Sequence, residues 1–300
     1  MIEFHEFLVA ILRSGTPLIY AALAGVIVHR SGVWHLGLEG IMIIGACVTI
    51  IGIVLTNSFI VAILSAIIIC IIVSILQWFV IEKLKANQII VGLGTTGIGI
   101  GGTAFAVESI FGGLAAISAP FGIPRIGDTF GPYSGLSVLV FIMPFAVLSL
   151  WVLLLRSRFG LRLAAAGEHP FAARSVGANP SIMRLIAFCI GGLFCALAGA
   201  ELAAGSLQIF AQNMVAGRGF MGFAAVIFGG GHPIGSALAA MFFSIVSVVG
   251  IRMQIHMGNF VSHDLLLCLP YIATVLGIWI TARAKGRTNS ASQLSELREQ

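Results

Sequence analysis

The chain has 300 residues, of which 59% are apolar, and it carries only 16 basic and 11 acidic side chains. Charged residues make up 9% of the sequence, against about 25% in a soluble globular protein, and the mean hydropathy is +1.08. This composition excludes a soluble fold. The net charge of +5 comes from Lys and Arg scattered in gaps between apolar runs, which is unlike the clustered basic surface of a nucleic-acid binder.

The apolar runs predict an all-α, polytopic membrane helix bundle of about nine spans, with eight or ten as alternatives. A helix that crosses the hydrocarbon core needs roughly 20 predominantly apolar residues. The runs lie at 7–28, 36–56, 59–81, 88–107, 136–155, 184–206, 219–230, 235–251 and 264–282. The seventh run is long enough for only about 18 Å of helix, so we expect a half-helix or a re-entrant segment there.

The N-terminal run allows two interpretations. Its apolar residues fall at helical spacing, which indicates either one full span or an interfacial helix that leads into a shorter span from Thr16. Glu3 and Glu6 stand where a cleaved signal peptide needs positive charge, so we expect no cleavage. The five cysteines lie inside apolar runs and indicate no disulfide framework.

Lys and Arg collect in alternate gaps, which predicts the orientation by the positive-inside rule. The richer set is Arg30, Lys83, Lys85, Arg156, Arg158, Arg162, Arg174, Arg184, Arg283, Lys285, Arg287 and Arg298. The opposite set is Arg13, Arg125, Arg218 and Arg252. We therefore expect the N-terminus outside and the C-terminus in the cytoplasm, a transmembrane domain over 1–282 and a polar cytoplasmic tail over 283–300. The outer loop at 108–135 is either a cap that faces a binding protein or a connector.

Glycines in the fourth run spell a nucleotide-binding pattern in the wrong context. Gly92, Gly94 and Gly97 form GxGxxG, but no strand precedes them, as a dinucleotide site requires. Gly97 and Gly101, like the small residues around Gly192, are instead typical of membrane helices that approach each other closely.

No catalytic or metal-binding constellation stands out, so we expect a transport protein rather than an enzyme. His35 and Glu39 are one helical turn apart, but no third ligand lies nearby in the sequence, and we expect no metal site. No GxxxxGK[ST] phosphate-binding loop is present. If ATP drives transport, the ATPase is therefore another chain.

Two acidic residues fall inside apolar runs, where an ionisable group indicates a function by default because it is costly to bury. Glu39 lies near the inner end of the second run and has either a structural role or a role in a transport path or gate. Glu201 lies late in the sixth run, near the outer face. We expect easy solvation there, and hence a structural or vestibule-lining role.

The inner loop at 156–184 contains signals for a short helix. Pro170 favours a helix start and Gly177 a helix end, and Asn179 with Pro180 begins the next helix. A helix this short is not stable alone in water. It docks either on the spans of this chain or in a groove of a cytoplasmic partner, with Phe171 as the apolar anchor.

At these residues the chain resembles the permeases of ATP-binding cassette importers in the branched-chain amino acid and ribose superfamily. Three stretches carry the resemblance: RSGVWHLGLEGIMIIG at 30–45, RFGLRLAAAGEHPFAARSVG at 158–177 and GRGFMGFAAVIFGGGHPIG at 217–235. A fourth, weaker stretch is Ala86-Asn87-Gln88. The pattern is most similar to the shorter permease of nucleoside and simple-sugar importers.

The resemblance implies a translocation path for a nucleoside or a simple sugar in the inner membrane. It also implies a second, usually longer permease, an extracytoplasmic binding protein, often a lipoprotein, and cytoplasmic ATP-binding subunits that hold ATP and magnesium. No cofactor is implied in this chain. The alternatives are the same importer class carrying riboflavin or a branched-chain amino acid, and an autonomous secondary carrier.

The resemblance also implies roles for particular residues. The segment that couples the spans to the ATPase would contain Glu168, Phe171, Ala172, Ala173 and Gly177. The substrate path or its gate would involve Gly37, Glu39, Gly40, Asn87 and Gln88. Phe171 stands where many importers have Glu, which favours an apolar knob over an ionic contact. His35 stands where the family usually has Asn, which leaves the substrate open.

Overall fold

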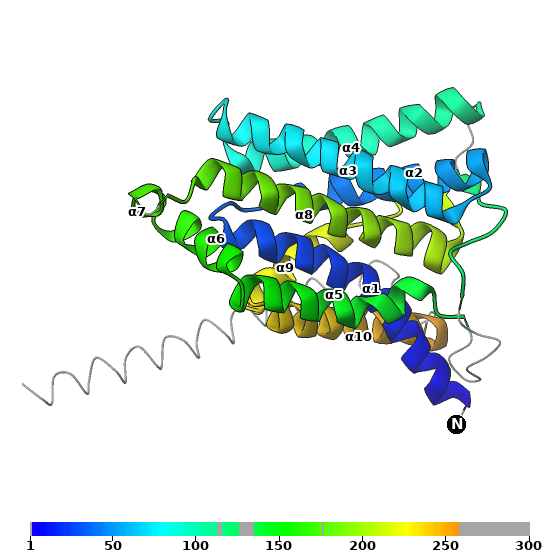
Figure 1. Cartoon of the computed structure of the whole chain (residues 1–300). Coiled ribbons are helices and arrows are strands. Elements are labelled where there is room, and N and C mark those ends of the chain that lie inside the picture. Colours follow the sequence, from blue (N-terminus) through cyan, green and yellow to red (C-terminus); the bar gives the residue numbers. More distant parts are fainter. Residues whose placement is uncertain (1, 113–115, 126–134, 176, 258–300) are drawn as a thin grey trace, which may run out of the picture. The chain divides into compact units, whose positions relative to one another are not determined.

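The computed structural model describes residues 2–112, 116–125, 135–175 and 177–257. The ninth predicted run, the polar tail and much of the outer loop therefore lie outside the described residues. The described elements, most of them labelled in Figure 1, are α1 (Ile2–Arg30), α2 (Leu38–Thr56), α3 (Phe59–Glu82), α4 (Gln88–Phe111), β1 (Ala116–Ser118), α5 (Val138–Leu155), α6 (Arg158–Glu168), α7 (Pro170–Ser175), α8 (Pro180–Ala200), the π-helix η2 (Glu201–Leu207), β2 (Ile209–Ala211), α9 (Arg218–Phe228) and α10 (Pro233–Met257).

Within the described residues, 7 helices are long and apolar enough to cross a membrane. They are α1, α2, α3, α4, α5, α8 together with η2, and α10, and they match the predicted runs. The predicted half-helix is α9, whose 11 residues reach only about 16 Å. The prediction of an all-α polytopic bundle is therefore confirmed. A compact unit ends at Ser244, within α10, and the features below all belong to it.

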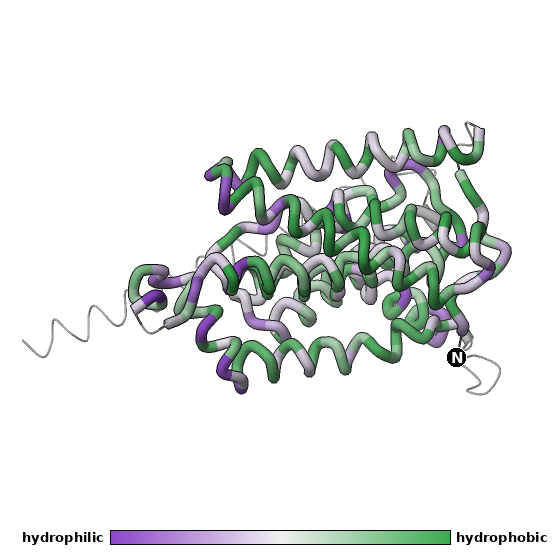
Figure 2. The backbone as a smooth tube through the Cα atoms, turned by 45° about the horizontal axis from the view of Figure 1, so that its top comes forward, coloured by the Kyte–Doolittle hydropathy of each residue, from purple (hydrophilic) through white to green (hydrophobic). Residues whose placement is uncertain are grey.

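Helices α1, α2 and α8 form the centre of this unit. Tyr20, Ile41 and Phe188 are among its largest fully buried side chains, and Figure 1 shows α8 running between α1 and the pair α2 and α3, all of which it contacts. Helices α3 and α5 each leave an apolar face exposed, with Ile68 and Phe145 as examples. Figure 2 shows hydrophobic residues along the helices and hydrophilic ones mostly at their ends.

Small residues bring the backbone of α8 against α2 and α3, as the sequence predicts. A Cβ atom on Gly192 would lie 2.8 Å from the carbonyl oxygen of Cys70. A Cβ atom on Gly45 would lie 3.0 Å from the Cα atom of Ala196. These distances leave no room for a larger side chain, so the helices pack backbone to backbone, as small residues allow in membranes.

Helix α4 packs through a different pair of glycines from the predicted one. No atom of the described chain lies within 4 Å of a Cβ added to Gly97 or Gly101. Gly92 and Gly99 are buried instead, and a Cβ on Gly99 would lie 2.6 Å from the carbonyl oxygen of Gly40. The close contact of α4 within this chain is therefore with the start of α2.

Helix α1 is one continuous helix from Ile2 to Arg30, so no break in the helix separates its N-terminal residues from the span that follows Thr16. Pro17 lies inside it, where proline removes one backbone donor. The neighbouring Thr16 hydroxyl donates to the Leu12 carbonyl at 2.8 Å. Arg13 lies on the same helix, and its Nη2 donates to the Gly135 carbonyl at 2.8 Å.

The chain between α8 and α9 is irregular and sets where α9 begins. After η2, β2 pairs antiparallel with β1, with Ile117 opposite Phe210. The turn that follows contains Asn213 and Ala216 at φ values of 55° and 46°. Residues other than glycine rarely adopt positive φ, although Asn does so more often than most, so the turn is irregular at both positions.

The helix signals of the inner loop are confirmed. Helix α7 begins at Pro170, Gly177 follows it with a φ of +78°, and the Asn179 side chain caps α8 by accepting from the N–H of Ser181 at 3.1 Å. Helix α8 therefore begins at Pro180, a turn earlier than its apolar run. Helix α6 was not predicted; its buried residues include Leu163.

Several helix ends meet at one end of this unit, which we call the basic end after Arg30, Lys83, Arg156, Arg158 and Arg184. Arg30 Nε donates to the Gly231 carbonyl at 3.1 Å, which joins the end of α1 to the turn after α9. Arg184, in the first turns of α8, bonds to Glu82 at the end of α3 at 2.8 Å. Helices α6 and α7 lie at this end too, as their contacts with α8 show.

Candidate functional site

The carboxylate of Glu39 binds the N-terminus of the half-helix α9. The N–H of Gly217 donates to its Oε1 at 2.7 Å, and the N–H of Gly219 donates to its Oε2 at 2.6 Å. The first N–H groups of a helix have no partner within the helix, and the helix dipole makes this end positive. Glu39 is only 4% exposed, so a buried charge of this chain satisfies the start of α9.

Gly37 and Gly40 lie on either side of Glu39 and allow close approach to two other helices. Gly37 precedes α2, and a Cβ on it would lie 2.5 Å from the amide nitrogen of Gln77 on α3. A Cβ on Gly40 would lie 2.6 Å from the Cα atom of Thr96 on α4. The first turn of α2 is therefore packed among α3, α4 and α9, and all three predicted residues are buried in this conformation.

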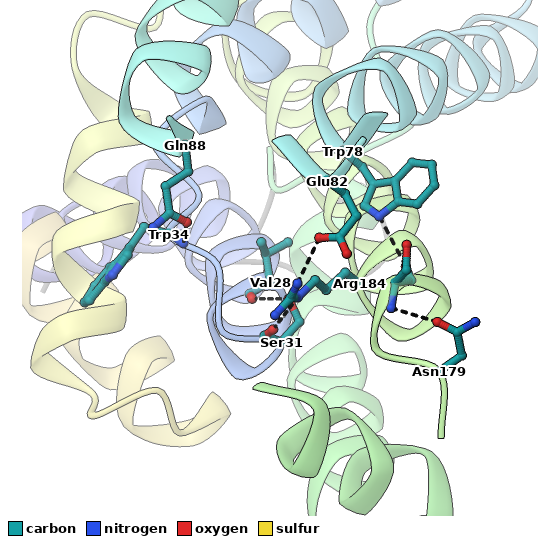
Figure 3. Close-up of polar contacts among 9 residues, drawn as sticks. Val28, Ser31, Trp34, Trp78, Glu82, Gln88, Asn179 and Arg184 are labelled. Carbon is teal, nitrogen blue, oxygen red and sulfur yellow. Dashed lines mark hydrogen bonds and ion pairs between the residues drawn. The ribbon is translucent and has the colours of Figure 1, made fainter. Parts of the chain in front are cut away.

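Asn87 and Gln88 lie at the start of α4, at the basic end. The Asn87 side chain caps α4 by accepting from the N–H of Ile89 at 2.9 Å. The Oε1 atom of Gln88 accepts from the backbone N–H of Trp34 at 3.0 Å, as Figure 3 shows. Gln88 therefore bonds to the residues between α1 and α2, here called the α1–α2 connection (31–37), while Asn87 is exposed.

The α1–α2 connection is also tied to α8 and α3. Arg184 donates from Nε to the Ser31 carbonyl at 3.2 Å and from Nη1 to Glu82 at 2.8 Å (Figure 3). Sequence reasoning missed this ion pair. Its signal was a single acidic residue at the end of one predicted span and a single basic residue at the start of another.

The end of α6 lies directly against the same connection. Gly32 has a φ of +82°, and a Cβ on it would lie 2.8 Å from the carbonyl oxygen of Gly167. A Cβ on Gly167 would lie 2.5 Å from the carbonyl oxygen of Arg30. Neither position has room for a side chain, so the segment before α7 and the connection before Glu39 touch through their backbones.

Helix α7 is anchored on one side and open on the other. Ala173 is buried and packs with Ala166 of α6 and Ala178. Phe171 is 86% exposed, and Ala172 is exposed beside it. Helix α7 therefore docks on this chain through Ala173, as one of the two alternatives predicts. Phe171 does not take part in this contact and faces away from the chain.

Two hollows lie at the basic end near α7. One, of about 310 Å³, is lined by Arg174, Gly177, Ala178 and Asn179. The other, of about 270 Å³, is lined by His29, Arg30, Gly32, Ala164, Gly167, Glu168, Gly230 and Gly231. The predicted residues Glu168 and Gly177 each line one of them, Glu168 just before α7 and Gly177 just after it.

His35 is buried in the α1–α2 connection, with its ring 5.3 Å from the ring of Phe188. Burial lowers the pKa of His35 to about 3, because an apolar environment disfavours the charged imidazole. The imidazole of His35 is therefore neutral at physiological pH. Within the described ranges, no group of three His, Cys, Asp or Glu could hold a metal ion.

Glu201 lies in a buried polar cluster at the other end of the unit, contrary to the expectation of easy solvation. It is 0% exposed, and its carboxylate accepts hydrogen bonds from the hydroxyls of Ser137 and Ser206. The charges of Arg13 and Arg125 act on it. Sequence reasoning missed this cluster, although the two arginines stood out as charges next to apolar runs.

The sequence matches the family described as branched-chain amino acid transport system / permease component over residues 7–281. The chain is 33% identical over 294 residues to the guanosine ABC transporter permease protein NupQ of Bacillus subtilis, covering 90% of this chain and 89% of that protein. It is 29% identical to the nucleoside ABC transporter permease protein NupC of Lactococcus lactis, covering 87% of each chain. No solved structure matches.

Sugar permeases are among the relatives too. The chain is 25% identical over 269 residues to a glucose ABC transporter permease of Haloferax volcanii, covering 84% of this chain and 71% of that one. These relatives are transport permeases rather than enzymes, and such permeases work with separate ATPases and binding proteins. The chain therefore belongs to the branched-chain amino acid transport system / permease component family and is a multi-pass permease subunit of an ATP-binding cassette importer.

Proposed function

We propose that this chain, with a second and longer permease subunit, forms the path by which a nucleoside enters the cell. The observation that carries the proposal is the bond between Glu39 and the start of α9. In membrane transporters, the free N-terminus of a broken helix attracts anionic groups of the substrate. Here a carboxylate of the protein takes that place, which favours an uncharged substrate over an amino acid with its own carboxylate.

The similarity to the guanosine and nucleoside permeases supports the same substrate class. Riboflavin remains an uncharged alternative within the same importer class. A simple sugar is the second candidate, favoured by the similarity to the glucose permease of Haloferax volcanii. An extracytoplasmic binding protein would deliver the substrate in each case.

The basic end is the cytoplasmic end in this proposal, because Lys and Arg are retained on the cytoplasmic side of membranes. The N-terminus is then outside, and the C-terminal tail at 283–300 is cytoplasmic. Helix α7 presents Phe171 and Ala172 to a groove of the ATPase, with Ala173 as its anchor on this chain. Glu168 and Gly177 flank it, and ATP and magnesium are held by the ATPase.

Movement at α7 would reach the substrate path through the α1–α2 connection. The contact of Gly167 with Gly32 links the end of α6, just before the coupling segment, to this connection, and the bond from Arg184 to Ser31 links the connection to α8. The connection continues into Gly37, Glu39 and Gly40, and Gln88 bonds to it from α4 next to Asn87. Glu39 then acts as a gate residue because it holds the start of α9.

Uptake by cells tests the substrate. Cells that lack this permease should lose import of radiolabelled guanosine, regain it with the wild-type gene, and take up leucine normally. Ligand binding by the partner binding protein should show the same preference. Loss of leucine uptake with normal guanosine uptake would overturn the proposal, and loss of glucose uptake alone would favour the sugar.

A further inference from the structure

Three polar side chains are buried together where α3 meets α8 beside the α1–α2 connection. His35 is 1% exposed, Ser74 is 0% exposed and Gln77 is 3% exposed. Among the described residues, both ring nitrogens of His35, the hydroxyl of Ser74 and both amide atoms of Gln77 have no hydrogen-bond partner. Roughly nine in ten buried polar groups are hydrogen-bonded in folded proteins, so three exceptions in one region require an explanation.

Close contacts place Ser74 and His35 against adjacent glycines of α8, and Gln77 against Gly37 in the connection that contains His35. The amide nitrogen of Gln77 lies 2.5 Å from where a Cβ on Gly37 would be, and Gly37 follows His35 by two residues. Ser74 lies one turn before Gln77 on the same face of α3, and its Oγ lies 2.5 Å from the Cβ position of Gly192. The His35 ring lies 3.7 Å from the Cβ position of Gly191, the residue before Gly192 on α8.

We propose that His35, Ser74 and Gln77 share a resident, uncharged hydrogen-bonding ligand, an ordered water molecule, that ties the α1–α2 connection to α3 and α8. An imidazole, a hydroxyl and a carboxamide offer donors and acceptors without charge. Internal waters are held by two to four otherwise unsatisfied polar groups, which fits three side chains. Burial keeps the pKa of His35 low, at about 3, so the imidazole is neutral at physiological pH and suits a neutral ligand.

This site is distinct from the contact between Glu39 and α9 and does not depend on the transported substrate. Both sites involve the segment that starts α2. Gly37 contacts Gln77 of the proposed water site, and Glu39, two residues later, binds the start of α9. The hydroxyl group of a bound permeant can form the same hydrogen bonds as a water molecule, so the ligand has two candidate sources, resident water and the permeant. The experiment therefore needs one arm for each source.

The first arm compares melting temperatures of the purified full-length permease with those of Ser74→Ala, Gln77→Leu and the double variant. A shared water predicts that each single variant melts lower, by about 2–4 °C, and that the double variant loses less than the sum. Ser65→Ala is the matched control on α3, because its hydroxyl already donates to the Ala62 carbonyl at 2.8 Å. If Ser74 and Gln77 have no ligand, removing their polar groups leaves the melting temperature unchanged or raises it, which overturns the proposal.

The second arm adds guanosine. If guanosine raises the melting temperature of the wild type but not of the double variant, the ligand is the permeant and the resident water is overturned. An experimental structure of the importer gives an independent check if a variant does not fold. Density within about 3 Å of the three groups supports the water, and empty density there, where other internal waters are visible, contradicts it.

Discussion

The carboxylate of Glu39 accepts a hydrogen bond at 2.6 Å from the N–H of Gly219, a residue 180 positions later in the chain. This contact joins the start of a full span to the start of a half-helix. The turn before α9, with Asn213 and Ala216 at positive φ, has no regular secondary structure of its own. Glu39 therefore fixes where α9 begins relative to α2.

Replacing Glu39 by Gln tests this dependence. The amide keeps the shape of the side chain but offers one acceptor oxygen instead of two, so one buried N–H of α9 loses its partner. An unsatisfied buried donor costs about 1–3 kcal/mol. We expect a lower melting temperature and at least a tenfold loss of uptake by the assembled importer. Glu6→Gln, at an exposed position of α1, is the control, and wild-type values for Glu39→Gln would contradict the assigned role.

Gly219→Ala tests the same contact from the side of α9. The added Cβ would lie 2.5 Å from both the N and Cα atoms of Glu39, and backbone atoms cannot move aside as a flexible side chain can. Overpacking of this kind costs about 1–3 kcal/mol. We expect a reduced melting temperature of the purified permease. Gly94→Ala meets nothing within 4 Å in the described chain and should melt like the wild type; equal values for the two variants would rule out the steric argument.

Phe171→Ala separates partner binding from folding. Phe171 is 86% exposed, so its truncation should leave the melting temperature of the isolated permease unchanged. As an aromatic anchor in an ATPase groove it should contribute at least a tenfold change in affinity, about 1.4 kcal/mol. Phe145→Ala, at an equally apolar and 72% exposed position of α5, is the control. The measurement is the dissociation constant for the ATPase, and an unchanged value would remove Phe171 from the coupling contact.

The buried imidazole of His35 predicts a pH dependence of stability. Its pKa falls from 6.5 to about 3 on folding, so the unfolded chain binds a proton that the folded chain does not. This contribution to stability is therefore complete well above pH 6.5 and decreases as the pH falls through 6.5 toward 3, by about 2 kcal/mol between pH 7.5 and pH 5. Denaturant titrations of wild type and His35→Gln at pH 7.5 and pH 5 measure it. In His35→Gln, most of the difference in unfolding free energy between pH 7.5 and pH 5 should disappear, whereas the exposed His169→Gln should keep it. A His35→Gln variant that keeps the full difference would refute the prediction.

The span pattern could be read from the sequence because long apolar runs have few alternatives in a membrane. The half-helix followed from length alone, since run 219–230 is too short to cross. The start of α7 at Pro170 and of α8 at Pro180 followed from proline and its fixed φ. Helix α6 was missed because it is only 11 residues long and carries Arg158 and Arg162 among apolar residues such as Leu163, so it forms no long apolar run.

The partners of the charged residues could not be predicted, because they are set by tertiary packing between distant segments. Glu39 was placed correctly near the inner end of its run, but nothing in the sequence connects it with Gly217 and Gly219. Because Glu201 lies late in its apolar run, near the outer face, it was expected to be solvated. Its burial results from the approach of Ser137 and two arginines, which neither spacing nor hydropathy encodes.

Charge compensation inside the chain also determines what the membrane voltage can do. The positive end of α9 and the carboxylate of Glu39 partly offset each other within the protein, which suits the uncharged permeant proposed above. Moving one elementary charge across 100 mV involves about 2.3 kcal/mol, and a neutral permeant avoids this work in either direction. Import along this path would then be electrically silent, and its accumulation ratio would be set by ATP hydrolysis alone.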